Sequence, residues 1–220
     1  MFTNSFPIDT VLDRIETAIA DYRPAAMFEL QQLGYTSLYE QLVSCIISIR
    51  TYDEVSTPVS IQLFERARTP QEMVTLSEAE LTELIAESTY PGQKAPNILR
   101  LSQQIIDEHG GETPADFDAL TAFKGVGPKC ANLALGVALN YPAISVDVHV
   151  HRITNRWGYV ATKTPEKTMK ALEAKLPQQH WVRINRLLVP FGKHICKGRY
   201  PKCASCPVHE WCAQIGVRIK

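Results

Sequence analysis

The sequence predicts an all-α protein, and three observations support this fold class. Apolar residues recur every three or four positions in almost every segment, as they do on one face of a helix. Helix-start signals precede several of these segments. No segment alternates apolar and polar residues between hairpin turns, and the only β-like stretch, residues 143–146, is short. The 220 residues, 45% of them hydrophobic, suffice for one large domain or two small ones.

The first expected helix lies near the N-terminus. Val11, Ile15 and Ile19 lie four residues apart and share one helical face, and Asp9 is expected to be the N-cap. Residues 38–48 are almost continuously apolar, which predicts a buried helix rather than an amphipathic surface helix.

The next helices are marked by local start and stop signals. Residues 53–66 place their apolar side chains on one face. Thr69 and Pro70 open a short helix with proline at its first position, and residues 77–80 resemble a capping box before another helix. Residues 89–92 break the pattern. Later helical segments are expected at residues 94–109, closed by Gly110 and Gly111, and at 114–122, 152–159, 165–176 and 178–191, about ten helices in all.

Four of the six cysteines lie close together near the C-terminus, with the spacing C-x6-C-x2-C-x5-C. The N-terminus has no apolar leader and no run could span a bilayer, so we expect a soluble protein with reduced thiols rather than disulfides. Four thiols in one short loop predict a metal centre, whose ligands are Cys196, Cys203, Cys206 and Cys212. Chemistry alone leaves zinc and a [4Fe–4S] cluster open. Cys45 and Cys130 are expected to be isolated in apolar surroundings.

The formal net charge is zero, but the charges are unevenly distributed. Residues 145–220 hold 14 Lys or Arg and 4 Asp or Glu, a net charge of +10, whereas residues 1–144 carry −10. This asymmetry suggests that the C-terminal third binds a polyanion. Two solvated faces that happen to differ in charge explain it equally well.

A glycine turn between two helical segments is a candidate phosphate site. It reads Phe-Lys-Gly-Val-Gly-Pro-Lys over residues 123–129. Gly125, Val126 and Gly127 permit a tight turn with outward amides, and amides at a helix N-terminus bind phosphate. Lys129 follows in the first helical turn, where the helix dipole and an expected partial desolvation both disfavour a cation. A neutral amine is a nucleophile, so Lys129 is a candidate catalytic residue, although a lone lysine is more often a surface group.

Asp147 is a second candidate catalytic residue. It lies between apolar residues in the segment Ser-Val-Asp-Val-His, residues 145–149. Its carboxylate can pair with a cation or act as a base, and it can equally cap the helix that follows.

These three sites, in this order, resemble those of the endonuclease III family, the helix-hairpin-helix DNA glycosylases with an iron–sulfur loop. The resemblance runs from about residue 38 to residue 212 and rests on residues 123–131, residues 146–149 and the four-cysteine loop. It implies two all-α lobes with a DNA-binding cleft between them. The six-helix lobe is expected at residues 31–141, and the iron–sulfur lobe at residues 1–30 together with 142–220.

The resemblance also implies a function. Members of this family excise oxidised pyrimidines from double-stranded DNA in base excision repair and cleave the strand at the resulting abasic site. Lys129 matches the catalytic lysine, which attacks C1′ of the damaged nucleotide and forms a Schiff base that permits β-elimination. Asp147 matches the family's aspartate, which assists the lysine and stabilises positive charge at the sugar. The four cysteines match the ligands of a [4Fe–4S] cluster with a structural or redox-sensing role.

The damaged nucleotide must leave the duplex, and the resemblance implies which residues contact the DNA. Tyr90 matches the wedge loop, where this chain has Thr-Tyr-Pro in place of the frequent Gly-Leu-Tyr. Arg50 stands where many members have glutamine, and it either inserts beside the lesion or pairs with Asp53 or Glu54. The hairpin and the basic cysteine loop are expected to supply further contacts, from Gly125, Val126, Gly127, His149, Lys197, Arg199 and Lys202.

Two alternatives on the same scaffold are less favoured. Adenine and mismatch glycosylases lack a lysine at the position of Lys129, and a non-catalytic or redox-sensing DNA-binding protein would not need both Lys129 and Asp147. We expect a monomer that acts on double-stranded DNA containing damaged pyrimidines or abasic sites. We expect it to bind no membrane and to reside in the cytoplasm, at the nucleoid if the source is bacterial.

Overall fold

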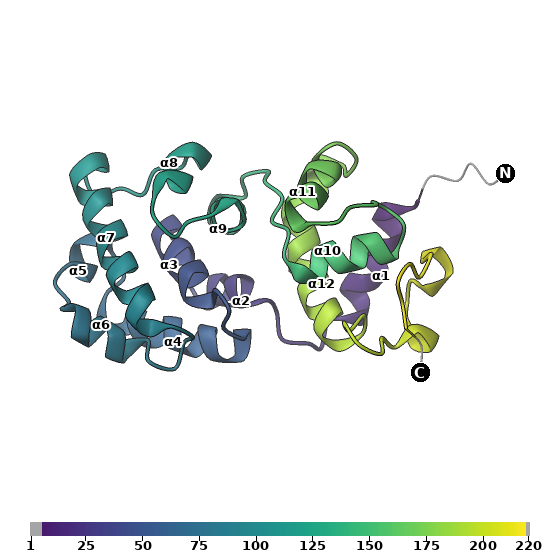
Figure 1. The fold of residues 1–220 in the computed structure, drawn as a ribbon, viewed down its shortest axis with the longest axis horizontal. Helices are drawn as coiled ribbons and strands as arrows, with labels where there is room; N and C mark the ends of the chain where they lie inside the picture. Colours follow the sequence, from purple (N-terminus) through teal and green to yellow (C-terminus); the bar gives the residue numbers. More distant parts are fainter. Residues whose placement is uncertain (1–5, 219–220) are drawn as a thin grey trace. The chain divides into compact units, whose positions relative to one another are not determined.

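The structure, a computed structural model, describes residues 6–218. Within these residues the chain forms twelve α-helices and three short 3-10 helices and no strand, so the all-α prediction is confirmed (Figure 1). The chain divides into two compact units, one of residues 26–143 and one that combines residues up to Ala25 with Ile144 onward. None of the described helices is both long and apolar enough to cross a membrane.

The unit of residues 26–143 is built around one buried helix. Helix α3 packs against α2, α4, α7 and α9, and ten of its eleven residues are buried, as its apolar run predicts. The helices of this unit are α2 (Ala26–Gln32), α3 (Leu38–Ser48), α4 (Asp53–Arg66), α5 (Pro70–Met73), α6 (Glu78–Leu84), α7 (Pro91–His109), α8 (Phe117–Ala122) and α9 (Pro128–Leu139). Helix α2 is the one that the sequence patterns did not indicate.

Capping residues set the helix starts in this unit. The predicted signals at Thr69 and Ser77 are both capping boxes, in which the hydroxyl accepts from the backbone of the third helical residue. Ser37 forms a further box before α3. Helix α7 begins at Pro91 rather than at residue 94, because proline occupies its first position and Tyr90 is the N-cap.

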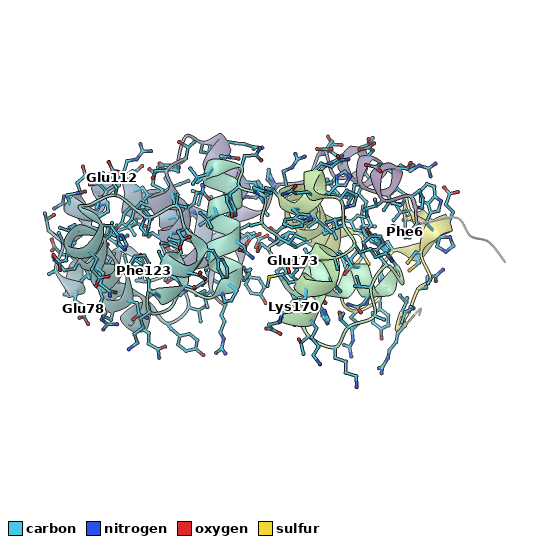
Figure 2. The ribbon with its side chains drawn as sticks, turned by 90° about the horizontal axis from the view of Figure 1, so that it is seen from above. Phe6, Glu78, Glu112, Phe123, Lys170 and Glu173 are labelled. Atoms are coloured by element: carbon cyan, nitrogen blue, oxygen red, sulfur yellow. A yellow bond between two sulfur atoms is a disulfide. The ribbon has the colours of Figure 1, made fainter. Side chains whose placement is uncertain are left out.

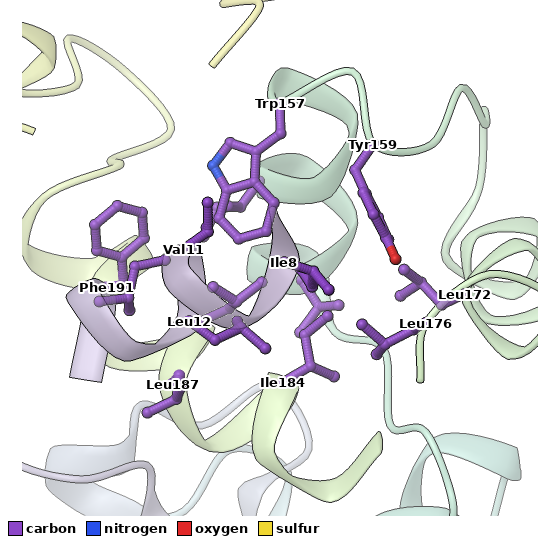
Figure 3. Packing of buried hydrophobic residues seen from close by; sticks show 14 of the residues in the cluster. Ile8, Val11, Leu12, Trp157, Tyr159, Leu172, Leu176, Ile184, Leu187 and Phe191 are labelled. Carbon is purple, nitrogen blue, oxygen red and sulfur yellow. The ribbon is translucent and has the colours of Figure 1, made fainter. Parts of the chain in front are cut away.

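The second unit packs the N-terminal helix against the C-terminal third. Ile8 and Leu12 of α1 point toward Ile184 and Leu187 of α12 in a core that also holds Trp157 (Figure 3). The helical elements are α1 (Ile8–Ala18), α10 (Val148–Arg156), α11 (Pro165–Glu173), η1 (Gln178–His180), α12 (Trp181–His194), η2 (Cys203–Ser205) and η3 (His209–Trp211). The predicted segment of residues 178–191 is therefore two elements, η1 and α12.

The prediction that Asp9 caps the first helix is wrong. The N-cap of α1 is Pro7, two residues earlier, and no side chain caps the helix. The Asp9 carboxylate instead lies 2.7 Å from Nε2 of His180, and this hydrogen bond is the main cause of the lowered pKa of Asp9. Asp9 therefore ties α1 to the segment before α12.

Candidate functional site

The glycine turn joins α8 to α9. Gly125 has a φ of 89°, a left-handed conformation that favours glycine, and Gly127 is the extended N-cap of α9. Val126 between them is buried, and its N–H donates to the carbonyl of Phe123, 3.1 Å away. Phe123 is itself buried in this unit (Figure 2). The turn is thus anchored by two apolar side chains while its glycines stay exposed at the start of a twelve-residue helix, where backbone amides can bind phosphate.

Lys129 is the second residue of α9. Its side chain is exposed, so the expected partial desolvation is absent in the DNA-free chain. Of the two effects expected to disfavour a cation at Lys129, only the dipole of the helix N-terminus is present. The lysine is accordingly accessible to a ligand bound at the glycine turn.

Asp147 is the N-cap of α10. Its Oδ1 accepts the N–H groups of His149 and Val150 at 3.0 and 2.9 Å, and the side chain is half-buried. The capping interpretation from the sequence is therefore correct, and it explains why α10 begins at Val148 rather than at residue 152. Both bonds use Oδ1, so the cap fixes the carboxylate and leaves Oδ2 for another partner.

His149 is held close to α12. Its Nδ1 lies 3.1 Å from Nη2 of Arg152, and its ring packs so tightly on Gly192 that a β-carbon there would collide with it. The imidazole is half-buried in this contact. Gly192 therefore permits the approach that fixes the orientation of His149.

Arg50 and Tyr90 lie side by side although they come from different loops. Arg50 lies between α3 and α4, and Tyr90 lies between α6 and α7. The Arg50 guanidinium carbon is 6.0 Å from the centre of the Tyr90 ring, and Tyr90 is half exposed. Both residues have positive φ angles, 57° and 58°, which are costly for side chains other than glycine. Strained backbone of this kind often occurs at functional sites.

The four candidate metal ligands come together in one hollow. Cys196 follows α12, Cys203 opens η2, Cys206 follows η2 and Cys212 follows η3, and all four are half-buried free thiols. Burial, followed by repulsion from the other thiols, raises the pKa of Cys206 to about 11. Four such groups lose their protons together only if a cation compensates their charge. Within residues 6–218 no three or more His, Cys, Asp or Glu side chains are close enough to hold a single metal ion.

Arg156 holds the start of the cysteine loop. This buried side chain donates from Nη1 to the Lys197 carbonyl at 2.6 Å and from Nη2 to the Gly198 carbonyl at 2.8 Å, and Nη1 also lies 3.4 Å from Sγ of Cys196. Arg156 was not among the site residues expected from the sequence. The available signal was a cation on the same helical face as the apolar Ile153. The basic residues of the loop, Lys197, Arg199 and Lys202, are all exposed.

The expectation that Cys45 and Cys130 are isolated is wrong, and so is the expectation of reduced thiols for this pair. Their sulfur atoms are paired in a disulfide between α3 and α9, both within the unit of residues 26–143. The two residues are 85 positions apart in sequence, and only the packing of α3 on α9 brings them together. The sequence therefore could not indicate this pair.

Comparisons with known proteins identify the family. Residues 43–178, which include the glycine turn, Lys129 and Asp147, match the HhH-GPD superfamily of base excision DNA repair proteins. The chain is 42% identical to endonuclease III of Thermotoga maritima over 177 residues, which are 80% of this chain and 83% of that protein. The chain belongs to the endonuclease III family. Endonuclease III of Bacillus subtilis is 34% identical to it over 94% of this chain and 92% of the relative.

Solved structures of the endonuclease III family agree with this assignment. A non-covalent endonuclease III–DNA complex superposes with a TM-score of 0.81 at 29% identity, and a trapped endonuclease III–DNA covalent intermediate with 0.80 at 30% identity. Each comparison covers 94% of both chains. The chain is therefore a base excision repair enzyme with DNA glycosylase and AP lyase activity, as predicted.

Proposed function

We propose that this endonuclease III family member excises oxidised pyrimidines from double-stranded DNA, with Lys129 as the nucleophile. The observation that carries the proposal is the position of Lys129, exposed in the first turn of α9 directly after the glycine turn. A phosphate held by the turn would keep the sugar of a neighbouring nucleotide near this amine. The trapped covalent intermediate of a relative supports a nucleophile of this kind.

The chemistry requires a neutral amine. After the damaged nucleotide has left the duplex, the Lys129 Nζ lone pair forms a bond to C1′. The bond from C1′ to the base breaks, and the base leaves with the electron pair and takes up a proton. Loss of a proton from the amine and opening of the sugar ring give a Schiff base. Removal of a proton from C2′ then breaks the C3′–O bond, and the 3′ phosphate leaves.

We assign Asp147 an electrostatic role in the same reaction. The cap holds its carboxylate in one orientation through Oδ1. A fixed negative charge stabilises positive character that develops at the sugar, because it needs no reorganisation during the reaction.

The remaining DNA contacts divide into two kinds. Tyr90 is proposed to fill the space left by the extruded nucleotide, and Arg50 to enter beside it, since both side chains lie on adjacent loops. Contacts to phosphates fix the position of the protein on DNA without reading its sequence. For these we propose the turn residues, the half-buried His149 and the exposed basic residues of the cysteine loop, namely Gly125, Val126, Gly127, His149, Lys197, Arg199 and Lys202.

We propose that Cys196, Cys203, Cys206 and Cys212 hold a [4Fe–4S] cluster. The four thiols line one hollow, and ligation by cysteines alone suits a [4Fe–4S] cluster. The bound cluster would supply the positive charge that the thiolates require and fix the loop that carries Lys197, Arg199 and Lys202.

The assignment of lobes and surroundings is also proposed. We equate the unit of residues 26–143 with the predicted lobe at 31–141, and the other unit with the predicted iron–sulfur lobe. The predicted iron–sulfur lobe includes residues 1–5 and 219–220, which lie outside the described residues. We further propose that the protein is a cytoplasmic monomer.

Borohydride trapping tests the nucleophile. The protein is incubated with an abasic-site duplex and borohydride, which reduces a Schiff base to a stable amine. The wild type and Lys124→Ala should form a covalent protein–DNA adduct, whereas Lys129→Ala should not. Lys124 is the matched control because it is an exposed lysine of the same turn. An adduct of normal yield with Lys129→Ala would overturn the proposal.

A further inference from the structure

Lys94 is a buried lysine that the proposed chemistry does not use. It lies in the first turns of α7, and only 6% of its surface is exposed. Its Nζ donates to the carbonyl of Ile47 at 2.6 Å and to Oγ1 of Thr51 at 3.0 Å. Lysines are rarely this buried without a partner. Burying an amine costs free energy, and these two hydrogen bonds offset part of that cost.

The two acceptors of the Lys94 amine belong to different parts of the chain. Ile47 lies in the last turn of α3, where carbonyl groups lack partners within the helix and a nearby cation is favourable. Thr51 lies in the loop between α3 and α4, one residue after Arg50. Lys94 itself follows Tyr90 by one helical turn. A single amine thus joins the end of α3, the Arg50 loop and the start of α7.

The hydroxyl of Thr51 extends this connection to the second loop. Its Oγ1 also accepts the backbone N–H of Thr89 at 3.1 Å. In return the Thr89 hydroxyl donates to the carbonyl of Arg50 at 2.9 Å. The residues immediately before Tyr90 and after Arg50 are therefore bonded to each other and, through Thr51, to Lys94.

This network surrounds the two residues with strained backbones. Arg50 and Tyr90 both adopt left-handed conformations, which are unfavourable for residues other than glycine. A conformation of that kind persists only where neighbouring bonds determine it. The bonds of Thr51 and Thr89 are placed directly beside both residues. They provide the restraint that keeps the two side chains together at the surface.

We infer that Lys94 is a positioning residue for lesion recognition: its buried amine fixes the Arg50 loop against the Tyr90 loop before DNA binds. This inference rests on the proposed insertion of Arg50 and Tyr90 into damaged DNA. Loops that are already ordered lose less conformational freedom on binding. This ordering therefore increases the affinity only for DNA into which the two side chains insert. The affinity for intact duplex, which is bound through its phosphates, is unchanged.

The test compares two duplexes of the same sequence, one with an uncleavable tetrahydrofuran abasic analogue and one undamaged. Lys94→Met preserves the length of the apolar stem and removes the donors. Arg100→Met is the matched control, because it removes an exposed cation from the same helix. Fluorescence anisotropy measures the dissociation constant for each duplex, and thermal unfolding confirms that each variant is folded.

Lys94→Met should lose roughly tenfold in affinity for the analogue, about 1.4 kcal/mol, and less than about twofold for the undamaged duplex. Arg100→Met should keep the wild-type ratio of the two affinities. Thr51→Val, which removes the shared hydroxyl at nearly constant volume, should reproduce the effect and settles the question if Lys94→Met does not fold. Equal losses for both duplexes, or an unchanged ratio, would overturn the inference.

Two further variants separate this inference from the proposed function. Arg50→Ala and Tyr90→Ala should each reduce the preference for the analogue. If they do and Lys94→Met and Thr51→Val do not, only the positioning role is wrong. If none of the four changes the preference, the proposed insertion of the two loops is wrong as well.

Discussion

Cys45 and Cys130 connect α3 to α9 by a disulfide, and Cys130 is the residue directly after Lys129. Their Cα atoms are 5.7 Å apart, within the range usual for this bond. Both side chains are buried. The bond therefore fixes the first turn of the helix that presents the proposed nucleophile against the central helix of its unit.

Reduction of this bond should lower stability. A disulfide that closes a long loop contributes about 2–4 kcal/mol, mainly by restricting the unfolded chain. We expect a reductant to lower the melting temperature of the wild type and to leave that of Cys45→Ala unchanged. Thiol-specific mass spectrometry under non-reducing conditions should show the pair oxidised. A wild type that melts at the same temperature with and without reductant would mean that the two sulfurs are not bonded in solution.

Substitutions of Asp147 should separate its capping role from its charge. Asparagine is as good an N-cap as aspartate, so Asp147→Asn should retain stability while losing most glycosylase activity. Asp147→Ala should lose activity and also about 0.5–2 kcal/mol of stability, because the Oδ1 bonds to His149 and Val150 disappear. Single-turnover kinetics and chemical denaturation measure the two effects. Full activity in Asp147→Asn would show that the residue acts only as a cap.

The buried amine of Lys94 should make stability depend on pH. Burial lowers its pKa in the folded chain from 10.5 to about 8. Between these two values the unfolded chain binds more protons, so the free energy of unfolding rises with pH. Below about pH 8 both states are protonated and the full penalty of burying the charge is present.

The measurement is the difference in free energy of unfolding between the wild type and Lys94→Met as a function of pH. This difference should be smallest below about pH 8 and should increase up to about pH 10.5. Subtracting the variant removes the contributions of other titrating groups. A difference that stays flat over this interval would show that the amine is not buried as described.

Arg156 should control how well the cysteine loop retains its cluster. The side chain donates to the sulfur of Cys196 and to the carbonyl groups of Lys197 and Gly198, so Arg156→Met removes the donors from three consecutive residues of that loop. We expect faster loss of iron and of visible absorbance during incubation with a chelator. Arg199→Met, an exposed arginine of the same loop, should retain the cluster like the wild type. Equal rates of loss in both variants would contradict this role.

Local signals in the sequence were sufficient for much of the fold. The proline after Thr69, the capping box at Ser77 and the apolar run of α3 predicted the helices that they mark. Helix α2 was missed because it has seven residues and follows Pro24 without a polar cap. Asp9 was misassigned because a nearby histidine, far along the chain, competes for its carboxylate.

In the candidate site, too, some residues could be predicted from local sequence and others could not. The glycine turn, Lys129, Asp147 and the four cysteines are recognisable because each motif is continuous in sequence. The network of Lys94 and the pairing of Cys45 with Cys130 depend on packing between distant helices. A lysine in a sequence is normally a surface residue, so nothing marks Lys94 before the end of α3 is placed beside it.

The measurement that tests the central claim most directly is peptide mapping of the borohydride-trapped adduct. After nuclease and protease digestion, tandem mass spectrometry locates the lysine that carries the reduced sugar. The mass increase should lie on Lys129 alone. A sugar attached to Lys94, Lys124 or the N-terminal amine would contradict the assignment of the nucleophile.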